Sequence, residues 1–234
     1  MLCNIPVPTQ DFKLEDFVRF EARVTPNHKE IVFPVRYVDS KCTIVGLRRL
    51  WMCPESRSLV EDNLPDGRMD AANRILPFPL GLHHAARTGA TSALLVASVL
   101  DSIVVCSRTN VMPVALAEGT VFLPPDHLPF FEPFERLSFW FPRDVAAFES
   151  VRAFAKKLDE QRCSAITRDV DNPASCLKPS EKRTLAQILT ESMQPVAHEH
   201  ITTFDSLRQD VFLEMCNFDQ VQFNPQFLNH VFDS

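Results

Sequence analysis

Glycine is scarce in this chain of 234 residues, which contains five, at positions 46, 67, 81, 89 and 119. A phosphate-binding loop of the G-x-x-x-x-G-K-[S/T] type needs two glycines separated by four residues and followed by lysine. No pair in the sequence has that spacing. These residues therefore cannot hydrolyse ATP by the usual phosphate loop.

Positive charge, long apolar runs and paired cysteines are also lacking. The net charge is −6 and the pI is about 5.6, whereas domains that bind nucleic acid by charge alone are basic. No apolar run approaches the ~18 residues of a membrane span. The seven cysteines include no C-x-x-C pair, which argues against a zinc ribbon and for reduced thiols in an intracellular protein. We expect no metal site.

Residues 1–16 read as a loose lead-in that is neither a secretory signal nor an Arg-rich transit peptide. A first subdomain is expected over residues 17–90. Its main feature is a β-hairpin of Ile31–Val38 and Thr43–Leu47, because β-branched and aromatic residues crowd both arms around a polar turn. Pro34 predicts an edge position or a bulge, and the polar stretch 53–73 predicts a loop or insertion.

Residues 91–170 alternate between short apolar runs and helical patterns. The expected strands are Ala93–Ala97, Val111–Leu116, Leu137–Phe141 and Cys163–Thr167, and the expected helices cover Leu100–Arg108, part of Pro124–Phe134 and the stretch after Asp144. Strands separated by helices indicate βαβ units, and so a mainly parallel α/β sheet. Together with the hairpin, this predicts an α/β protein that is α+β overall.

Residues 171–234 form a polar linker followed by helices. One helix is marked by the apolar residues Leu185, Ile188 and Leu189. A later helix has one apolar face, and because no sheet partners it we expect that face to contact another subunit. The residues of this face are Phe204, Leu207, Val211 and Met215.

The acidic residues at two strand ends resemble those of the Toprim domain of primases, topoisomerases and related nucleases. In its E-G-x-x-D pattern, Asp101 matches the Asp and Ala97 replaces the Glu. In its D-x-D pattern, Asp144 matches the second Asp and Pro142 replaces the first. The family binds Mg²⁺ through these acids. The resemblance therefore implies a vestigial site with no catalytic residue, and Asp144 is expected to act as a helix N-terminal acid.

The hairpin also resembles a segment of bacterial primases that reads roughly F-P-[IV]-x-D-x-x-G-x-[IV]-[IV]-G-[FL]. The matching residues are Phe33, Pro34, Val35, Asp39, Val45, Gly46 and Leu47. A primase-like subdomain followed by a degenerate Toprim domain would then cover residues 17–170.

Residues 123–164 and 201–215 resemble the animal mitochondrial replicative DNA helicases, and the match includes the non-catalytic pair Phe139-Trp140. These are hexameric 5′–3′ helicases. The resemblance implies a mitochondrial matrix or nucleoid location, a role in mitochondrial DNA replication, and partnership with a helicase motor and neighbouring subunits. ATP and Mg²⁺ would serve only that motor, so no cofactor is expected here. Since the sequence stops where the motor would begin, we expect a partial sequence or a reduced paralogue.

Weak, salt-sensitive binding of single-stranded DNA is expected from local cations. The candidates are Arg48, Arg49, Arg108, Arg143, Lys156 and Lys157. The chain alone is thus expected to be a non-enzymatic module for ring assembly and weak DNA binding. Two alternatives stay open at this point: an active metal-dependent Toprim primase or nuclease, and a free-standing structural scaffold protein.

Overall fold

The computed structural model describes residues 14–26, 29–56, 58–65, 78–117, 119–166, 172–177 and 184–196. All of them belong to the first of two compact units, Met1–His200. The predicted interface helix, with Phe204, Leu207, Val211 and Met215, lies outside the described residues.

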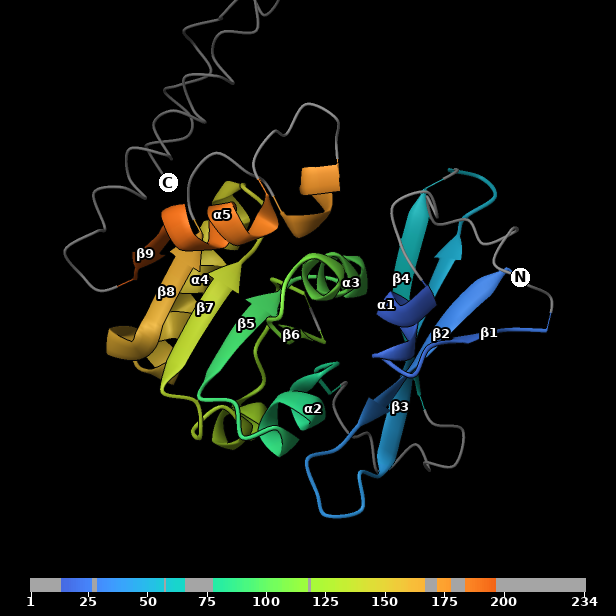
Figure 1. The fold of residues 1–234 in the computed structure, drawn as a ribbon, viewed down its shortest axis with the longest axis horizontal. Coiled ribbons are helices and arrows are strands. Elements are labelled where there is room, and N and C mark those ends of the chain that lie inside the picture. Colours follow the sequence, from blue (N-terminus) through green and yellow to red (C-terminus); the bar gives the residue numbers. More distant parts are fainter. Residues whose placement is uncertain are drawn as a thin grey trace, which may run out of the picture. The chain divides into compact units, whose positions relative to one another are not determined.

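A four-stranded antiparallel sheet forms the N-terminal part, in the order β1-β2-β3-β4 (Figure 1). It follows the short helix α1, and its strands are β1 (Arg23–Val24), β2 (Glu30–Arg36), β3 (Ile44–Met52) and β4 (Leu59–Pro65). Helix α1 covers Leu14–Val18. Alternate residues of β2 are buried, as the period of a strand with one covered face requires. The predicted β2–β3 hairpin is confirmed.

One detail of this sheet agrees with the sequence-based expectation and one differs from it. Pro34 lies beyond the part of β2 that pairs with β1, and the register shifts between Val35 and Arg36, so the bulge expected near Pro34 is present one residue further on. The stretch 53–73 was expected to be a loop, but β4 lies within it and pairs with β3 over seven positions. That prediction was wrong because the acidic residues of β4 hide its strand character.

The second sheet has five strands in the order β6-β5-β7-β8-β9. They are β5 (Ser92–Val96), β6 (Pro113–Ala115), β7 (Arg136–Trp140), β8 (Cys163–Ile166) and β9 (Met193–Pro195). The pairs among β5, β6, β7 and β8 are parallel, and β9 joins β8 in the antiparallel direction. The mainly parallel sheet is confirmed, whereas β9 was not predicted.

Helices cover this sheet. They are α2 (Leu82–Arg87), α3 (Val99–Arg108), α4 (Val145–Leu158) and α5 (Leu185–Glu191), with 3₁₀ turns η2 (Pro125–Phe130), η3 (Glu160–Arg162) and η4 (Pro173–Leu177). The β5–α3–β6 and β7–α4–β8 crossovers run in opposite directions along the sheet, so right-handed connections place α3 and α4 on opposite faces. Helix α5 lies on the same side as α3, which it contacts (Figure 1).

The core lies between these layers. The fully buried side chains include Leu95 on β5, Ile103 on α3, and Phe139 and Trp140 on β7. Gly81 precedes α2 with a φ of 88°, and a Cβ there would lie 2.6 Å from the Pro113 carbonyl oxygen, so glycine allows α2 to approach β6. The molecule is an α+β protein with a mainly parallel α/β sheet. Within the described ranges, no helix is long and apolar enough to cross a membrane.

Candidate functional site

The turn between β5 and α3 holds one of the two Toprim-like acids. Ser98 is the N-cap of α3, and its hydroxyl accepts a hydrogen bond from the backbone N–H of Asp101 at 3.0 Å. The same hydroxyl donates to Asp101 Oδ2 at 2.7 Å. The other carboxylate oxygen, Oδ1, accepts from the backbone N–H of Ala174 in η4 at 3.0 Å. Asp101 therefore joins the start of α3 to a segment 73 residues away.

Asp101 is 1% exposed. Burial raises the pKa of its carboxyl group from 3.8 to about 6, against the opposing effect of the hydrogen bond from Ser98. The nearby carboxylate of Glu61 raises the pKa further. Near neutral pH this acid is therefore ionised only at a cost in folding free energy.

The turn between β7 and α4 holds the second acid. Asp144 is itself the N-cap of α4, and its Oδ1 accepts a hydrogen bond from the backbone N–H of Ala147 at 2.8 Å. The side chain is exposed. The prediction that Asp144 is a helix N-terminal acid is confirmed, because it satisfies one of the otherwise unpaired N–H groups of the first turn.

The two positions where the family has further acids carry no side-chain oxygen. These positions are Ala97, which follows β5, and Pro142, which lies just after β7. Gly119 lies close to the first of them, since a Cβ on Gly119 would be 3.4 Å from the Ala97 carbonyl oxygen. Mg²⁺ prefers several carboxylate or water oxygens in octahedral geometry. Both carboxylate oxygens of Asp101 accept hydrogen bonds from donors of the protein, and Asp144 caps a helix. The residues at this edge do not fit a Mg²⁺ ion, and among the described residues no group of three or more His, Cys, Asp or Glu could hold a metal.

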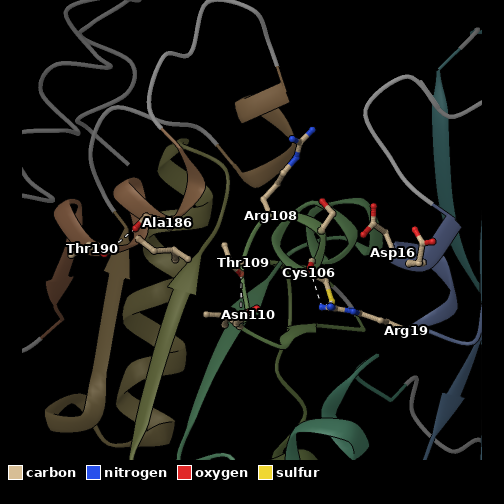
Figure 2. A pocket seen from close by; sticks show the side chains of 12 residues that line it. Asp16, Arg19, Cys106, Arg108, Thr109, Asn110, Ala186 and Thr190 are labelled. Atoms are coloured by element: carbon tan, nitrogen blue, oxygen red, sulfur yellow. Dashed lines mark hydrogen bonds between the residues drawn. The ribbon is translucent and has the colours of Figure 1, made fainter.

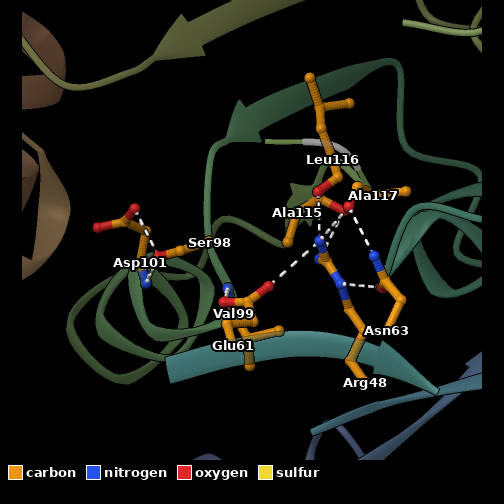
Figure 3. Close-up of polar contacts among 9 residues, drawn as sticks. All are labelled: Arg48, Glu61, Asn63, Ser98, Val99, Asp101, Ala115, Leu116 and Ala117. Atoms are coloured by element: carbon orange, nitrogen blue, oxygen red, sulfur yellow. Dashed lines mark hydrogen bonds and ion pairs between the residues drawn. The ribbon is translucent and has the colours of Figure 1, made fainter. Parts of the chain in front are cut away.

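Arg48 reaches this edge from the four-stranded sheet (Figure 3). Its side chain is on the buried face of β3, opposite Phe33 of β2, and it is 2% exposed. Its guanidinium donates to the backbone carbonyl oxygens of the last residue of β6 and of the two residues after it, and it pairs with the carboxylate of Glu61. We therefore correct the prediction that Arg48 contacts DNA phosphates, because a buried guanidinium with these partners is not available to them.

Arg49 lies on the opposite face of β3. It donates to both carboxylate oxygens of Asp62, at 2.9 and 2.6 Å, and to Glu30 at 3.1 Å. Its guanidinium lies 5.3 Å from the ring centre of Trp51. The hydrogen bonds from Arg49 hold the pKa of Asp62 below its ordinary value. Its charge is already neutralised by these acids, which weakens the case for a phosphate contact.

The other predicted DNA-binding cations are exposed but separated. Arg143 stands before α4, and Lys156 and Lys157 are in its last turn. With a rise of 1.5 Å per residue, the two ends of this helix are about 20 Å apart. Lys157 donates to the Leu123 carbonyl oxygen at 3.1 Å. Arg108 ends α3 on the other face of the sheet, so these residues do not form one patch.

A pocket of about 850 Å³ lies where α1, the carboxyl end of α3 and α5 meet (Figure 2). Arg19, the residue after α1, reaches toward α3 and donates to the Cys106 carbonyl oxygen at 3.1 Å. Asp16 on one side and Arg108 on the other give the lining charges of both signs. Arg108 is the predicted site residue found there.

Sequence reasoning missed the pocket and the polar partners of Arg48. Glu61 and Asn63 belong to β4, which the sequence presents as a polar loop. The alternation of β3 gave a usable signal, since Arg48 is two residues from the apolar Leu50 and so shares its face.

The chain folds into a hairpin-containing antiparallel sheet followed by a mainly parallel α/β sheet with few acids at its carboxyl edge. No protein-family model matches the sequence. The fold is that of the primase catalytic domains. The primase fragment of the bacteriophage T7 primase-helicase is similar with a TM-score of 0.58 and 14% identity, over 80% of this chain and 72% of that one.

Two further structures show the same likeness. The DnaG primase catalytic domain bound to single-stranded DNA has a TM-score of 0.58 and 15% identity, over 82% of this chain and 71% of that one. The primase domains in a bacteriophage T7 complex with lagging-strand DNA polymerase, an RNA/DNA hybrid and dTTP have a TM-score of 0.58 and 13% identity, over 80% and 90% of the two chains.

Proposed function

We propose that this chain is the catalytically inactive primase-like module of a mitochondrial hexameric replicative DNA helicase of the Twinkle type. One observation carries the proposal: a primase fold whose remaining acids are both taken up by protein donors, Asp101 by Ser98 and Ala174 and Asp144 by the first turn of α4. Ala97 and Pro142 supply no side-chain oxygen to complete the site. The sequence resemblance to the mitochondrial helicases, and the likeness to a phage primase-helicase fragment, support the association with a motor.

The work of such a module is to help assemble the ring and to hold single-stranded DNA weakly. One similar structure is a primase domain bound to single-stranded DNA. With a net charge of −6 and separated cations, this chain would contact few phosphates. With Arg48 buried and Arg49 held by Asp62 and Glu30, the remaining candidates are the exposed residues Arg108, Arg143, Lys156 and Lys157.

Fluorescence anisotropy with a labelled single strand tests the DNA arm. We expect a Kd in the micromolar range or weaker that rises steeply with salt, and a logarithmic salt slope that falls by about one for each phosphate contact removed. Arg143→Ala and Lys156→Ala should each weaken binding, whereas Arg49→Ala, whose guanidinium is held by acids, is the matched control. Binding in the nanomolar range that ignores salt contradicts this proposal. If neither the parent nor any variant binds the strand, the DNA-binding role is contradicted and the alternative of a structural scaffold protein is favoured.

Primer synthesis and nuclease assays with Mg²⁺ or Mn²⁺ test the catalytic arm, and we expect no activity above the buffer. Metal-dependent product that disappears in Asp101→Asn would establish the alternative of an active Toprim enzyme.

The mitochondrial and ring-assembly arms need the protein in its cellular form. Endogenous protein should co-fractionate with mitochondrial DNA. With a motor attached, Leu207→Asp with Val211→Asp should weaken hexamer formation in sedimentation experiments, because the substitutions place charge on the predicted apolar face.

A further inference from the structure

Arg48 sits inside a shell of oxygen atoms. Its Nη1 lies 3.3 Å from the Ala115 carbonyl oxygen and its Nη2 lies 3.0 Å from that of Ala117. Nη2 also donates to the Leu116 carbonyl oxygen. Three successive main-chain carbonyls, at the carboxyl end of β6, thus point at one guanidinium (Figure 3). A run of carbonyls turned toward one point needs a donor or a cation to stabilise it.

Side chains from β4 complete the shell. Glu61 Oε1 lies 3.2 Å from Arg48 Nη2, and Asn63 Oδ1 accepts from Arg48 Nε at 3.1 Å. The Asn63 amide also donates to the Ala117 carbonyl oxygen at 3.0 Å, which fixes its orientation. Carbonyl, carboxylate and amide oxygens together are the ligand set of a hard cation. Here a side chain of the protein itself supplies the positive charge.

The shell adjoins the turn after β5, which holds Asp101 and has no acid at Ala97. The second oxygen of Glu61, Oε2, accepts a hydrogen bond of 2.7 Å from the backbone N–H of Val99, the first residue of α3. This carboxylate from β4 therefore stands two residues beyond Ala97, the position without an acid.

We propose that Arg48 is a built-in cation that occupies an oxygen site between the two sheets and holds the carboxyl edge of the parallel sheet in a state that needs no exchangeable ion. The guanidinium pairs with Glu61, gives each of the three carbonyls at the end of β6 a further donor, and joins the antiparallel sheet to the parallel one. This role is independent of the proposed function, since it concerns how the fold is held together, and its readout is stability rather than DNA binding.

Chemical rescue of Arg48→Ala in the full chain tests the proposal. The variant should melt about 10 °C below the parent, because Glu61 loses its cation and three successive carbonyls each lose one of their donors. Guanidinium chloride at about 50 mM should then raise the melting temperature of Arg48→Ala by about 3 °C relative to the same concentration of urea in matched sodium chloride. Urea has the same shape as guanidinium but no charge.

Arg49→Ala is the control, since Arg49 is the next residue on the same strand but faces outward between Asp62 and Glu30. Neither it nor the parent should be stabilised by guanidinium relative to urea. Equal responses of Arg48→Ala and Arg49→Ala overturn the proposal.

If Arg48→Ala fails to fold, Arg48→Lys and Arg48→Met decide the question. The lysine variant keeps the charge with fewer donors and should melt between the parent and the methionine variant. A methionine variant as stable as the lysine variant shows that packing alone holds the edge, and the proposal falls.

Discussion

The turns after β5 and β7 begin their helices with nearly the same backbone, but they place their acids in different surroundings. The N-cap of α3, Ser98, has φ −134° and ψ 161°, and the N-cap of α4, Asp144, has φ −135° and ψ 163°. In the first turn the acid is Asp101, three residues into the helix, buried and bonded to Ala174. In the second the acid is the cap itself and is exposed. The comparison teaches that an acid at the end of a parallel strand can take either of two structural roles, and that its place in the turn decides which.

The largest expected effect comes from removing the buried acid. At about pH 4, where Asp101 is protonated in the fold, Asp101→Ala should lower the free energy of unfolding by about 3 kcal/mol, because the N–H of Ala174 and the Ser98 hydroxyl lose a buried acceptor. Thermal unfolding should show a fall of about 10 °C in the melting temperature. A change as small as that of Asp144→Ala would mean that the two acids are equivalent.

The second prediction concerns pH. Because the pKa of Asp101 is raised to about 6 in the fold, its protonated form is favoured there, so this group's contribution to stability is full below about pH 4 and is lost as pH rises through 6. Asp101→Asn can accept from Ala174 and donate to Ser98, but does not ionise. The stability of this variant relative to the parent should rise by roughly 2 kcal/mol between pH 4 and pH 7.

Glu61 is a titratable group that acts on Asp101, and burial raises the pKa of the Glu61 carboxyl group as well. The pH comparison is therefore made again in Glu61→Gln, where the rise should be smaller but present. Urea unfolding at both pH values gives the measurement. A flat difference would show that Asp101 titrates normally.

A smaller effect is expected at the exposed cap. Asp144→Ala should lower the melting temperature by about 3 °C, and Asp144→Ser should restore most of it, because serine also accepts from the N–H of Ala147. An unchanged melting temperature in Asp144→Ala would show that the Asp144 cap does not stabilise the fold.

The smallest expected effect is on metal binding. By calorimetry the parent should show no stoichiometric Mg²⁺ site tighter than about millimolar. Ala97→Glu with Pro142→Asp should improve the affinity, but by no more than about tenfold, because Asp101 keeps its protein donors and the cation of Arg48 stays in place. Submicromolar binding by the restored variant would show that the edge still has the geometry of an active site.

The order of elements from β5 to β8 could be predicted because each apolar run and each helical face is encoded locally. Asp144 was also predicted as a helix N-terminal acid, since a carboxylate before an apolar helical pattern has a known local partner. The acids of β4 could not be placed in this way. Glu61 and Asp62 lie in a strand where Arg48 and Arg49 of β3 pair with them, and such cross-strand partners are not visible in either segment alone.

Arg48 and Arg49 show most clearly how far a side chain's surroundings can be predicted from the sequence. They are adjacent and identical, and composition assigns both to DNA. The period of the strand places one inside and one outside, which was predictable from Leu50 and Trp51. The partners of the buried guanidinium were not predictable, because the carbonyls of residues 115–117 are 67 to 69 residues away in the sequence.

The edges of the parallel sheet limit how this protein can meet other chains. One outer strand, β9, is three residues long and ends with Pro195, which has no N–H to donate. At the other side β6 is also three residues long, and Leu80 bridges to its Ala115. In the described part of the chain, neither edge of this sheet is a long, unpaired strand with which a strand of another chain could pair. Growth into larger assemblies at this sheet must therefore use side-chain surfaces rather than shared backbone, which also protects it from fibre-like stacking.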